Sequence, residues 1–334
     1  MSEINREMKM RAVVMERLGG TEVLQLAELE CPRPGPGEVL VQVVCAGVNP
    51  ADWKCREGYL GAFFEYRFPF VLGFDLAGTV SAVGEGVHDL PLGTRVFAQS
   101  DVGGGKWGSY AEYACVSRAS VVEMPANLDF AVAAAVPTPA LAAWAGLFDE
   151  GGLQPGMKVL VHGGGSAVGG FAIQLARWAG ATVVTTCGPD NLAYVQDLGA
   201  ELAIDYRSED IGSALHRWAP DGVDLVLDCI GAGSLPDALD LLRKGGILVA
   251  ILTLVPGDAG PNHADAARNG LRTAVAYSRM PSGETLGRIA GLLADGHLRP
   301  PRLEVLPLAE VATAHERLQQ GRARIKQVLQ VAEA

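Results

Sequence analysis

Residues Val159–Ala181 read VLVHGGGSAVGGFAIQLARWAGA: a short apolar strand, a glycine-rich turn and an amphipathic helix. When the pattern G-x-G-x-x-G is aligned on Gly169, it becomes Gly164, Ser166 and Gly169, with serine in place of the middle glycine. Glycine permits the sharp turn, and small residues let the backbone approach a pyrophosphate that the helix N-terminus attracts. The turn therefore predicts dinucleotide binding, although tight strand–helix turns also use glycine for structural reasons alone.

The same unit opens a regular alternation of apolar and amphipathic segments. The expected strands are 159–163, 182–187, 202–206, 223–231, 247–252 and 273–278, and the expected helices are 171–180, 191–200, 211–219, 235–246 and 283–296, the last covering the sixth strand. The apolar runs are continuous, as parallel strands covered by helices on both faces require. This order predicts an α/β fold with a doubly wound parallel sheet.

The chain before this region has a different character. Short β-like runs such as Glu38–Gly47 and Leu76–Val87 are broken by Gly and Pro, which indicates a β-rich domain. An Ala-rich stretch, 131–148, is expected to form two helices separated at Pro137 and Pro139. Near the C-terminus, strands at 303–308 and 325–331 and a helix at 309–319 return to the first pattern.

These patterns predict two domains. The β-rich domain comprises residues 1–127 and 298–334, and the doubly wound domain comprises residues 128–297. A chain of 334 residues is long enough for two cores. One large α/β domain with a β-rich extension is the alternative.

Composition narrows the possible partners. The net charge of −11 argues against a nucleic-acid or acidic-membrane partner, because either would need a basic face. No apolar run reaches the ~18–20 residues of a membrane span, and the polar start MSEINREMKM lacks an apolar core, so we expect a cytoplasmic protein. The six cysteines contain no C-x-x-C pair, which favours free thiols over disulfides or a zinc knuckle.

The second strand predicts which dinucleotide is bound. NAD proteins place an acid at its end to hold the ribose 2′-hydroxyl, but here the strand ends at Thr185–Gly188 without one. Asp190 follows a Gly-Pro pair and is expected to cap the next helix. The nearest candidate partners of a 2′-phosphate are Tyr206 and Arg207. The sequence thus favours NADPH over NADH.

Several further blocks stand in a specific order along the chain. They are CAGVNPADWKCREG (Cys45–Gly58), FPFVLGFDLAGTVSAVGEGV (Phe68–Val87), GSYAEY (Gly108–Tyr113), VPTPALAAW (Val136–Trp144) and LGAELAIDYR (Leu198–Arg207). With the glycine-rich turn, they resemble the zinc-free quinone oxidoreductase (zeta-crystallin-like) branch of the medium-chain dehydrogenase/reductase superfamily. NPADWK and TCGPDN are also similar to trans-acting enoyl reductases. The resemblance implies a GroES-like catalytic domain, a Rossmann NADPH-binding domain, a cleft between them and a homodimer.

The resemblance also implies which residues meet the cofactor. Asn49 would lie near the nicotinamide ribose and Thr138 by the nicotinamide, and Lys326 would be a further contact. The others are Gly164, Gly165, Ser166, Ala167, Val168 and Gly169 at the pyrophosphate; Thr186, Cys187, Gly188, Asn191 and Tyr206 around the 2′-phosphate; and Cys229, Ile230 and Ile251 along the groove over the adenine and nicotinamide.

No metal is expected. Zinc alcohol dehydrogenases take their catalytic ligands from a Cys, a His in a G-H-E triplet and a later Cys or Asp. This chain has Asn49 at the first position, Gly73-Phe74-Asp75 at the triplet, and Thr138 or a neighbour at the third. A phenylalanine side chain cannot ligate a metal.

A zinc-free site favours a reaction in which hydride delivery does most of the chemistry. We expect NADPH-dependent reduction of a quinone, or of the C=C of an α,β-unsaturated carbonyl. Tyr59 and Lys54 are candidate catalytic proton donors, with water as another route and with plain structural roles as alternatives. The aromatic segment Gly61–Phe70 suggests an apolar small-molecule acceptor, or packs its domain. The alternative function is a non-catalytic NADPH-binding protein of the same fold.

Overall fold

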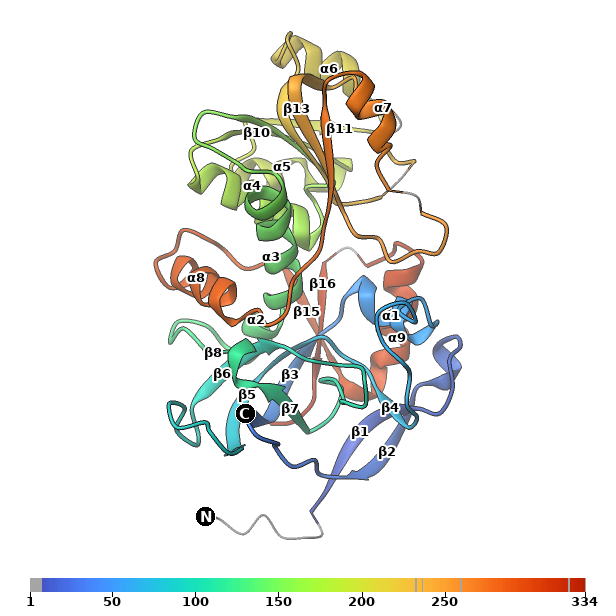
Figure 1. Ribbon diagram of the computed structural model, residues 1–334, viewed down its shortest axis with the longest axis vertical. Helices are drawn as coiled ribbons and strands as arrows, with labels where there is room; N and C mark the ends of the chain where they lie inside the picture. Colours follow the sequence, from blue (N-terminus) through green and yellow to red (C-terminus); the bar gives the residue numbers. More distant parts are fainter. Residues whose placement is uncertain (1–7, 232, 236, 259, 324, 334) are drawn as a thin grey trace. The chain divides into compact units, whose positions relative to one another are not determined.

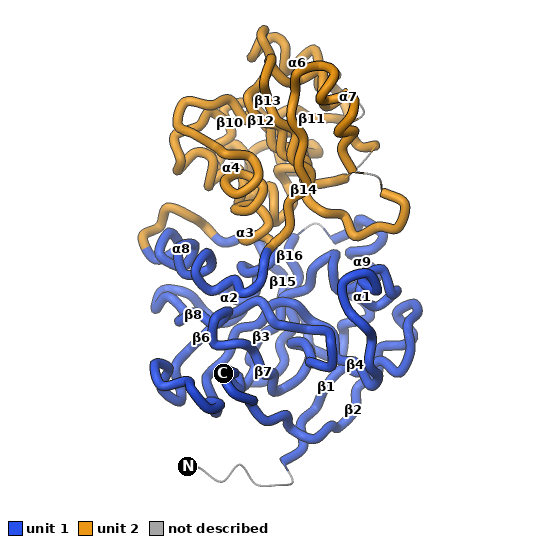
Figure 2. The backbone as a smooth tube through the Cα atoms, in the orientation of Figure 1, with its two compact units in different colours: residues 1–138, 279–294, 300–334 blue, residues 139–278, 295–299 orange. Residues whose placement is uncertain are grey.

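The computed structural model describes residues 8–231, 233–235, 237–258, 260–323 and 325–333. The chain divides into two compact units (Figure 2). Unit 1 comprises residues 1–138, 279–294 and 300–334, and unit 2 comprises residues 139–278 and 295–299. The two domains predicted from the sequence, with limits at 127/128 and 297/298, stay a prediction. No helix in the described residues is long and apolar enough to cross a membrane.

Unit 2 is built on one six-stranded parallel sheet (Figure 1). Its strands are β9 (Lys158–His162), β10 (Thr182–Cys187), β11 (Leu202–Asp205), β12 (Val223–Asp228), β13 (Leu242–Ile251) and β14 (Arg272–Ala276). The spatial order is β11-β10-β9-β12-β13-β14, so the chain starts in the middle, runs to one edge, and then returns to build the other side. This is the order of a Rossmann sheet, which confirms the predicted fold class.

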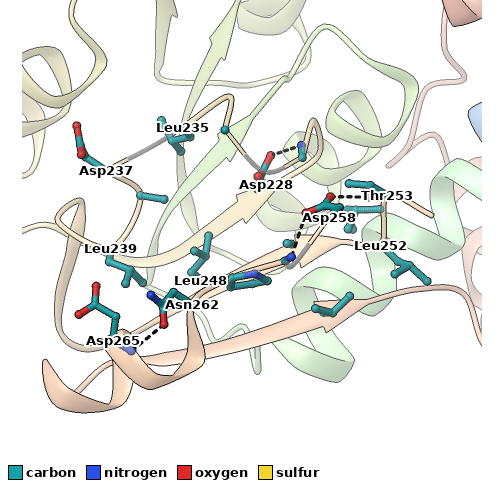
Figure 3. A pocket seen from close by; sticks show the side chains of 18 of the residues that line it. Asp228, Leu235, Asp237, Leu239, Leu248, Leu252, Thr253, Asp258, Asn262 and Asp265 are labelled. Atoms are coloured by element: carbon teal, nitrogen blue, oxygen red, sulfur yellow. Dashed lines mark hydrogen bonds between the residues drawn. The ribbon is translucent and has the colours of Figure 1, made fainter. Parts of the chain in front are cut away.

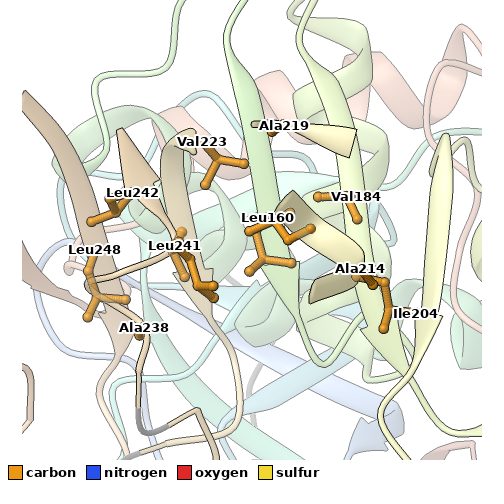
Figure 4. Close-up of a cluster of buried hydrophobic side chains, with 12 residues drawn as sticks. Leu160, Val184, Ile204, Ala214, Ala219, Val223, Ala238, Leu241, Leu242 and Leu248 are labelled. Atoms are coloured by element: carbon orange, nitrogen blue, oxygen red, sulfur yellow. The ribbon is translucent and has the colours of Figure 1, made fainter. Parts of the chain in front are cut away.

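The centre of the sheet of unit 2 is buried because apolar residues dominate its middle strands. Leu160, Val184 and Val223 come from three neighbouring strands and pack into one cluster with α6 (Figure 4). The helices are α3 (Pro137–Trp144), which crosses the unit boundary, α4 (Ala167–Trp178), α5 (Leu192–Asp197), α6 (Ile211–Trp218) and α7 (His263–Arg268), with a π-helix at Ala145–Glu150 and a 3-10 helix at Pro189–Asn191.

The predicted helix over 235–246 is wrong in the described part of that range. The chain makes turns there, and β13 already begins at Leu242. Backbone N–H groups there donate to the carbonyl three residues earlier, as from Ala238 to Leu235 (3.3 Å) and from Leu242 to Leu239 (3.2 Å). Ala238 and Leu242 are nevertheless buried in the core. The apolar residues in this range are spaced as in a helix because they are buried, and tight turns can bury residues at the same spacing.

Unit 1 is β-rich. Its larger sheet contains β15 (Leu303–Pro307), β16 (Lys326–Gln330), β3 (Glu38–Gly47), β5 (Asp75–Val83), β6 (Arg95–Gln99) and β8 (Val121–Glu123), with β7 (Tyr113–Ser117) also paired to β3. A smaller sheet contains β2 (Gln25–Glu30), β1 (Lys9–Met15) and β4 (Phe70–Val71). The C-terminal strand β16 pairs antiparallel with β3, so the end of the chain completes the sheet begun by its first part.

Short helices complete unit 1. They are α1 (Pro50–Arg56), α2 (Phe130–Ala134), α8 (Gly283–Ala294) and α9 (Val311–Gln319), with 3-10 helices at Thr21–Val23, Arg118–Ser120 and Leu308–Glu310. The helix predicted over 283–296 forms as α8, but its expected role as cover of the sixth strand is wrong. It packs against β8 in unit 1, where the Ser282 backbone N–H reaches the Ser120 hydroxyl at 3.4 Å.

At Gly283, where α8 begins, the backbone lies close to Ala119. We predict that a larger side chain at this position destabilises the fold. A Cβ there would lie 2.3 Å from the Ala119 carbonyl oxygen, so Gly283→Ala should destabilise unit 1 by roughly 1–3 kcal/mol. Gly291 lies in the same helix with open space around its Cβ position. Gly291→Ala should therefore stabilise by about 0.5–1 kcal/mol. Urea unfolding midpoints measure both, and equal midpoints would contradict the prediction.

Candidate functional site

The glycine-rich turn of unit 2 joins β9 to α4. Gly163 has φ +86°, a left-handed conformation that glycine adopts without strain. Ser166, at the position of the middle glycine, caps α4: its Oγ accepts the Gly169 N–H at 3.0 Å and donates to the Gly163 carbonyl at 2.8 Å. Serine thus closes the turn on itself, while Ala167 and Val168 start the helix and stay partly exposed.

Two glycines of the motif are required by packing. A Cβ on Gly169 would lie 2.3 Å from the Gly163 carbonyl oxygen, and a Cβ on Gly164 would lie 2.1 Å from the Thr185 hydroxyl. Gly165 faces the Asn191 side chain, with its Cβ position 2.6 Å from the amide nitrogen. Helix, turn and second strand therefore meet with almost no space between them.

The residues predicted to hold the 2′-phosphate lie together at the ends of β10 and β11. The Gly188 Cβ position is 3.7 Å from the Tyr206 hydroxyl, and Tyr206 is half exposed. The Arg207 guanidinium lies over the Tyr206 ring, 5.8 Å from its centroid. Thr186 and Cys187, by contrast, are buried. Burial raises the pKa of the Cys187 thiol to about 11.

The remaining predicted cofactor residues of unit 2 follow β12 and end β13. The Cys229 backbone N–H donates to the His162 carbonyl at 3.1 Å, and Ile230 is half exposed. Ile251 lines a cavity of about 460 Å³, whose walls include Asp228 and the segment after β13 (Figure 3). The parallel strands thus bring the predicted residues of unit 2 to one edge of the sheet, where such sheets bind ligands.

In unit 1, three of the predicted cofactor residues gather around Asp75. Its carboxylate accepts the Asn49 amide N–H at 2.8 Å and the Thr138 hydroxyl and backbone N–H at 2.6 and 2.9 Å. Lys326 Nζ lies 3.8 Å from the same carboxylate; it donates to the Val48 carbonyl at 2.9 Å and to the Asn49 amide oxygen. All but Thr138, which is partly exposed, are buried.

A second buried carboxylate lies beside this group. Asp52 accepts the Asn49 backbone N–H at 2.7 Å at the start of α1. Burial raises the pKa of Asp52 to about 7, with the nearby Asp75 adding to the rise and Lys326 opposing it. Burial also raises the pKa of Asp75 and lowers that of Lys326. Two carboxyl groups thus share one ammonium group, a balance that favours keeping one proton on the pair.

Behind Asp52 runs a line of buried polar side chains. Arg56 Nη1 lies 3.3 Å from His315 Nδ1, and His315 Nε2 lies 3.2 Å from the Tyr110 hydroxyl. Because a guanidinium can only donate, Nδ1 accepts and Nε2–H donates to Tyr110. Tyr110 in turn helps to lower the pKa of Asp52. Burial, aided by Arg56, lowers the pKa of His315 to about 3, so the ring stays neutral.

The two predicted proton donors lie on and after α1. Lys54 Nζ is 5.4 Å from the Trp53 ring centroid, and Tyr59 packs edge-on against the same ring. The Glu57 carboxylate, through a hydrogen bond and its charge, raises the pKa of Tyr59. Tyr59 therefore keeps its proton at neutral pH. The catalytic roles of Lys54 and Tyr59 stay predictions.

The sequence did not predict that Asp75 binds Asn49, Thr138 and Lys326 in unit 1. It also did not predict the contact of His162 with Thr186. The line Arg56–His315–Tyr110 gave no signal at all, because its members stand far apart in the sequence. Within the described residues, no three His, Cys, Asp or Glu side chains stand close enough to hold a metal ion.

Family comparisons bear on the whole chain. The family model described as alcohol dehydrogenase GroES-like domain matches residues 35–126, and the one described as zinc-binding dehydrogenase matches residues 198–329. A quinone oxidoreductase from Lama guanicoe is 32% identical over 316 residues, covering 92% of this chain and 93% of that protein. The chain belongs to the medium-chain dehydrogenase/reductase family, in its quinone oxidoreductase branch.

Two other similar proteins are named as an alkenal/one oxidoreductase and an enoyl reductase. The NADPH-dependent alkenal/one oxidoreductase of Arabidopsis thaliana chloroplasts is 36% identical, covering 73% of this chain and 62% of that protein. The crystal structure of CurK enoyl reductase is 25% identical, with a TM-score of 0.85 over 97% of this chain and 99% of that chain. These relatives support an oxidoreductase with a nicotinamide cofactor and a small-molecule substrate, and they confirm the predicted resemblance to enoyl reductases.

We predict that the buried carboxyl group of Asp52 makes the free energy of unfolding depend on pH. The pKa of Asp52 rises from 3.8 to about 7 on folding, so folding favours its protonated form, and stability should fall as pH rises from about 4 to about 7. Asp52→Asn leaves Asp75 and Lys326 as a balanced pair. The variant should melt roughly 2–4 °C above the wild-type protein at pH 8, equivalent to about 1 kcal/mol, with a smaller gain at pH 5.

Exposed Asp221 provides the control for this prediction. Asp221→Asn also removes one carboxylate, and it should leave the melting temperature nearly unchanged at both pH values. A loss of stability in Asp52→Asn at pH 8 would show that the ionised carboxylate stabilises the fold.

Proposed function

We propose that the protein is a zinc-independent NADPH-dependent reductase that delivers hydride to a quinone or to the C=C of an α,β-unsaturated carbonyl. One observation carries the zinc-independent part. Asn49 and Thr138, at two positions where zinc alcohol dehydrogenases carry ligands, are both hydrogen-bonded to Asp75. Their side chains are thereby engaged by the Asp75 carboxylate, and Phe74 offers no ligand atom. The quinone oxidoreductase and alkenal/one oxidoreductase relatives support the choice of acceptor.

The cofactor residues fit a dinucleotide by their chemistry. A helix N-terminus capped by Ser166 favours an anionic group, and the partly exposed Gly165, Ala167 and Val168 offer a small-residue surface to a pyrophosphate. Tyr206 and Arg207 would meet the 2′-phosphate. When bound, the nicotinamide supplies the hydride.

The chain's own residues would hold the reacting groups and the proton. Asn49 and Thr138, both fixed by Asp75, would position the nicotinamide end of the cofactor. Lys326 would fix the other side of the Asn49 amide, which it contacts directly. Tyr59, whose pKa is raised, or Lys54 would donate the final proton to the acceptor. We also propose that the protein works as a homodimer in the cytoplasm.

An acceptor screen tests the function. Purified protein is mixed with NADPH or NADH and a panel of quinones, enals and enones in a stopped-flow spectrometer, and loss of the reduced-nicotinamide absorbance is followed. Turnover with at least one class, faster with NADPH, is expected, and product analysis separates one-electron from two-electron transfer. Tight NADPH binding without turnover would favour the non-catalytic NADPH-binding alternative. About one zinc bound per chain would overturn the zinc-independent part.

The proposed preference for NADPH predicts that Arg207 contributes to the affinity for NADPH and not to that for NADH. Arg207→Ala removes the cation placed over Tyr206, so the Kd for NADPH should rise about 5–10-fold, as loss of a charge-assisted contact to phosphate predicts. The Kd for NADH should change less than about 2-fold, because NADH has no 2′-phosphate. Isothermal titration calorimetry measures both constants.

The matched control is Arg217, an exposed arginine of α6 in the same unit that pairs with Glu209 at 3.6 Å. Arg217→Ala should leave both affinities unchanged. Equal weakening of NADPH and NADH binding by Arg207→Ala would contradict a 2′-phosphate site at the end of β11.

A further inference from the structure

His162, the last residue of β9, has hydrogen-bonding partners on both sides of its ring. Its Nδ1 lies 2.7 Å from the Thr186 hydroxyl oxygen, and that oxygen lies 3.1 Å from the Gly163 backbone nitrogen. Its Nε2 lies 3.2 Å from the Ser234 hydroxyl oxygen, which lies 2.6 Å from the Gly231 carbonyl oxygen. The ring thus stands in the middle of a continuous hydrogen-bonded line.

The direction of every bond in this line can be derived. A carbonyl oxygen only accepts, so Ser234 donates its single hydroxyl proton to Gly231 and must accept from His162 Nε2–H. In a neutral ring, Nδ1 is then an acceptor, and Thr186 donates to it. The Thr186 oxygen is left to accept the Gly163 N–H. The line therefore works with the Nε2–H form of a neutral imidazole.

The line joins three segments that are predicted to contact the cofactor. Gly163 begins the glycine-rich turn, Thr186 lies at the end of β10, and Ser234 follows β12. These segments come together because β9 lies between β10 and β12 in the sheet. The Ile230 side chain, after β12, also lies against the turn, 2.5 Å from the position of a Cβ on Gly163.

A proton on His162 would break the line. The ring is 5% exposed, and burial lowers its pKa below 6.5 although Asp228 opposes this shift. Asp228 on β12 is the charged group facing the ring, and its carboxylate accepts the Ile230 and Gly231 N–H groups at 2.9 and 3.1 Å. With both ring nitrogens protonated, Thr186 would lose the acceptor of its own proton.

We propose that His162 is a positioning residue for the dinucleotide: its Nδ1 lone pair orients the Thr186 hydroxyl, which fixes the Gly163 N–H and with it the glycine-rich turn. The inference rests on the proposed dinucleotide binding at this turn and not on the identity of the acceptor. It assigns His162 no contact with the hydride acceptor.

Two substitutions separate the two sides of the ring. The amide oxygen of His162→Asn reaches the place of Nδ1 and can still accept from Thr186. The amide nitrogen of His162→Gln reaches the place of Nε2, so it can still donate to Ser234 but leaves Thr186 without its acceptor. We expect the Kd for NADPH to stay within about 3-fold of the wild-type value in His162→Asn and to rise about 10-fold in His162→Gln.

The pH dependence of binding is a second readout that a purely structural role would not move. Binding of NADP⁺, chosen because NADPH decomposes in acid, should weaken in the wild-type protein as pH falls through the lowered pKa of His162. In His162→Asn binding should weaken less over the same pH range, because the amide does not titrate and only the 2′-phosphate, whose second pKa is about 6, still takes up a proton. Melting temperatures recorded in parallel report whether each variant is folded.

Thr186→Val provides the test if His162→Gln fails to fold. It removes the hydroxyl on the same side of the ring, so it should also raise the Kd for NADPH about 10-fold, whereas Thr186→Ser should restore binding. Equal affinities in His162→Asn and His162→Gln would overturn the positioning role alone. Failure of the wild-type protein to bind either NADPH or NADH would overturn the dinucleotide proposal together with it.

Discussion

The contact between the start of α4 and the end of β9 governs the arrangement of unit 2. Gly169 lies so close to Gly163 and Gly164 that any Cβ would overlap the backbone. This approach brings the first turn of the helix directly onto the strand end, where Ser166 can close the turn by capping. Because β10 and β12 flank β9 in the sheet, their carboxyl ends then lie beside the same helix terminus. Because Gly169 has no side chain, the start of α4 can lie close to the ends of all three strands.

Unit 1 holds several charged groups out of water within an otherwise apolar core. Asp52, Asp75 and Lys326 are buried together, and Arg56 is buried nearby against His315. Such groups are poor sources of stability, because desolvation offsets most of their mutual attraction. Asp52 illustrates the cost, since its raised pKa means that the fold disfavours its ionised form. Retention of this group is therefore better explained by what it positions, the Asn49 amide and the Thr138 hydroxyl, than by stability.

The sequence predicted what depends on neighbouring residues and missed what depends on distant ones. The continuous apolar runs correctly indicated a parallel sheet, and the replacement of a motif glycine by Ser166 was visible, although its capping role was not. The helix over 235–246 was wrong because helical spacing records burial and not hydrogen bonding. The role of Asp75 could not be found, since its partners Asn49, Thr138 and Lys326 come from separate parts of the chain.

The proposed preference for NADPH depends on one acid that lies on a neighbouring strand. Asp205 ends β11 and pairs in register with Cys187, so a carboxylate stands close to the predicted 2′-phosphate position. Its oxygens, however, accept the Arg207 backbone N–H at 3.0 Å and the Ser208 hydroxyl at 2.9 Å. The carboxylate is thus engaged by its own turn, while the Arg207 side chain extends over Tyr206. One acceptor position on each oxygen is thereby taken up within its own turn, and the cation beside it favours a phosphate, which supports NADPH as the cofactor.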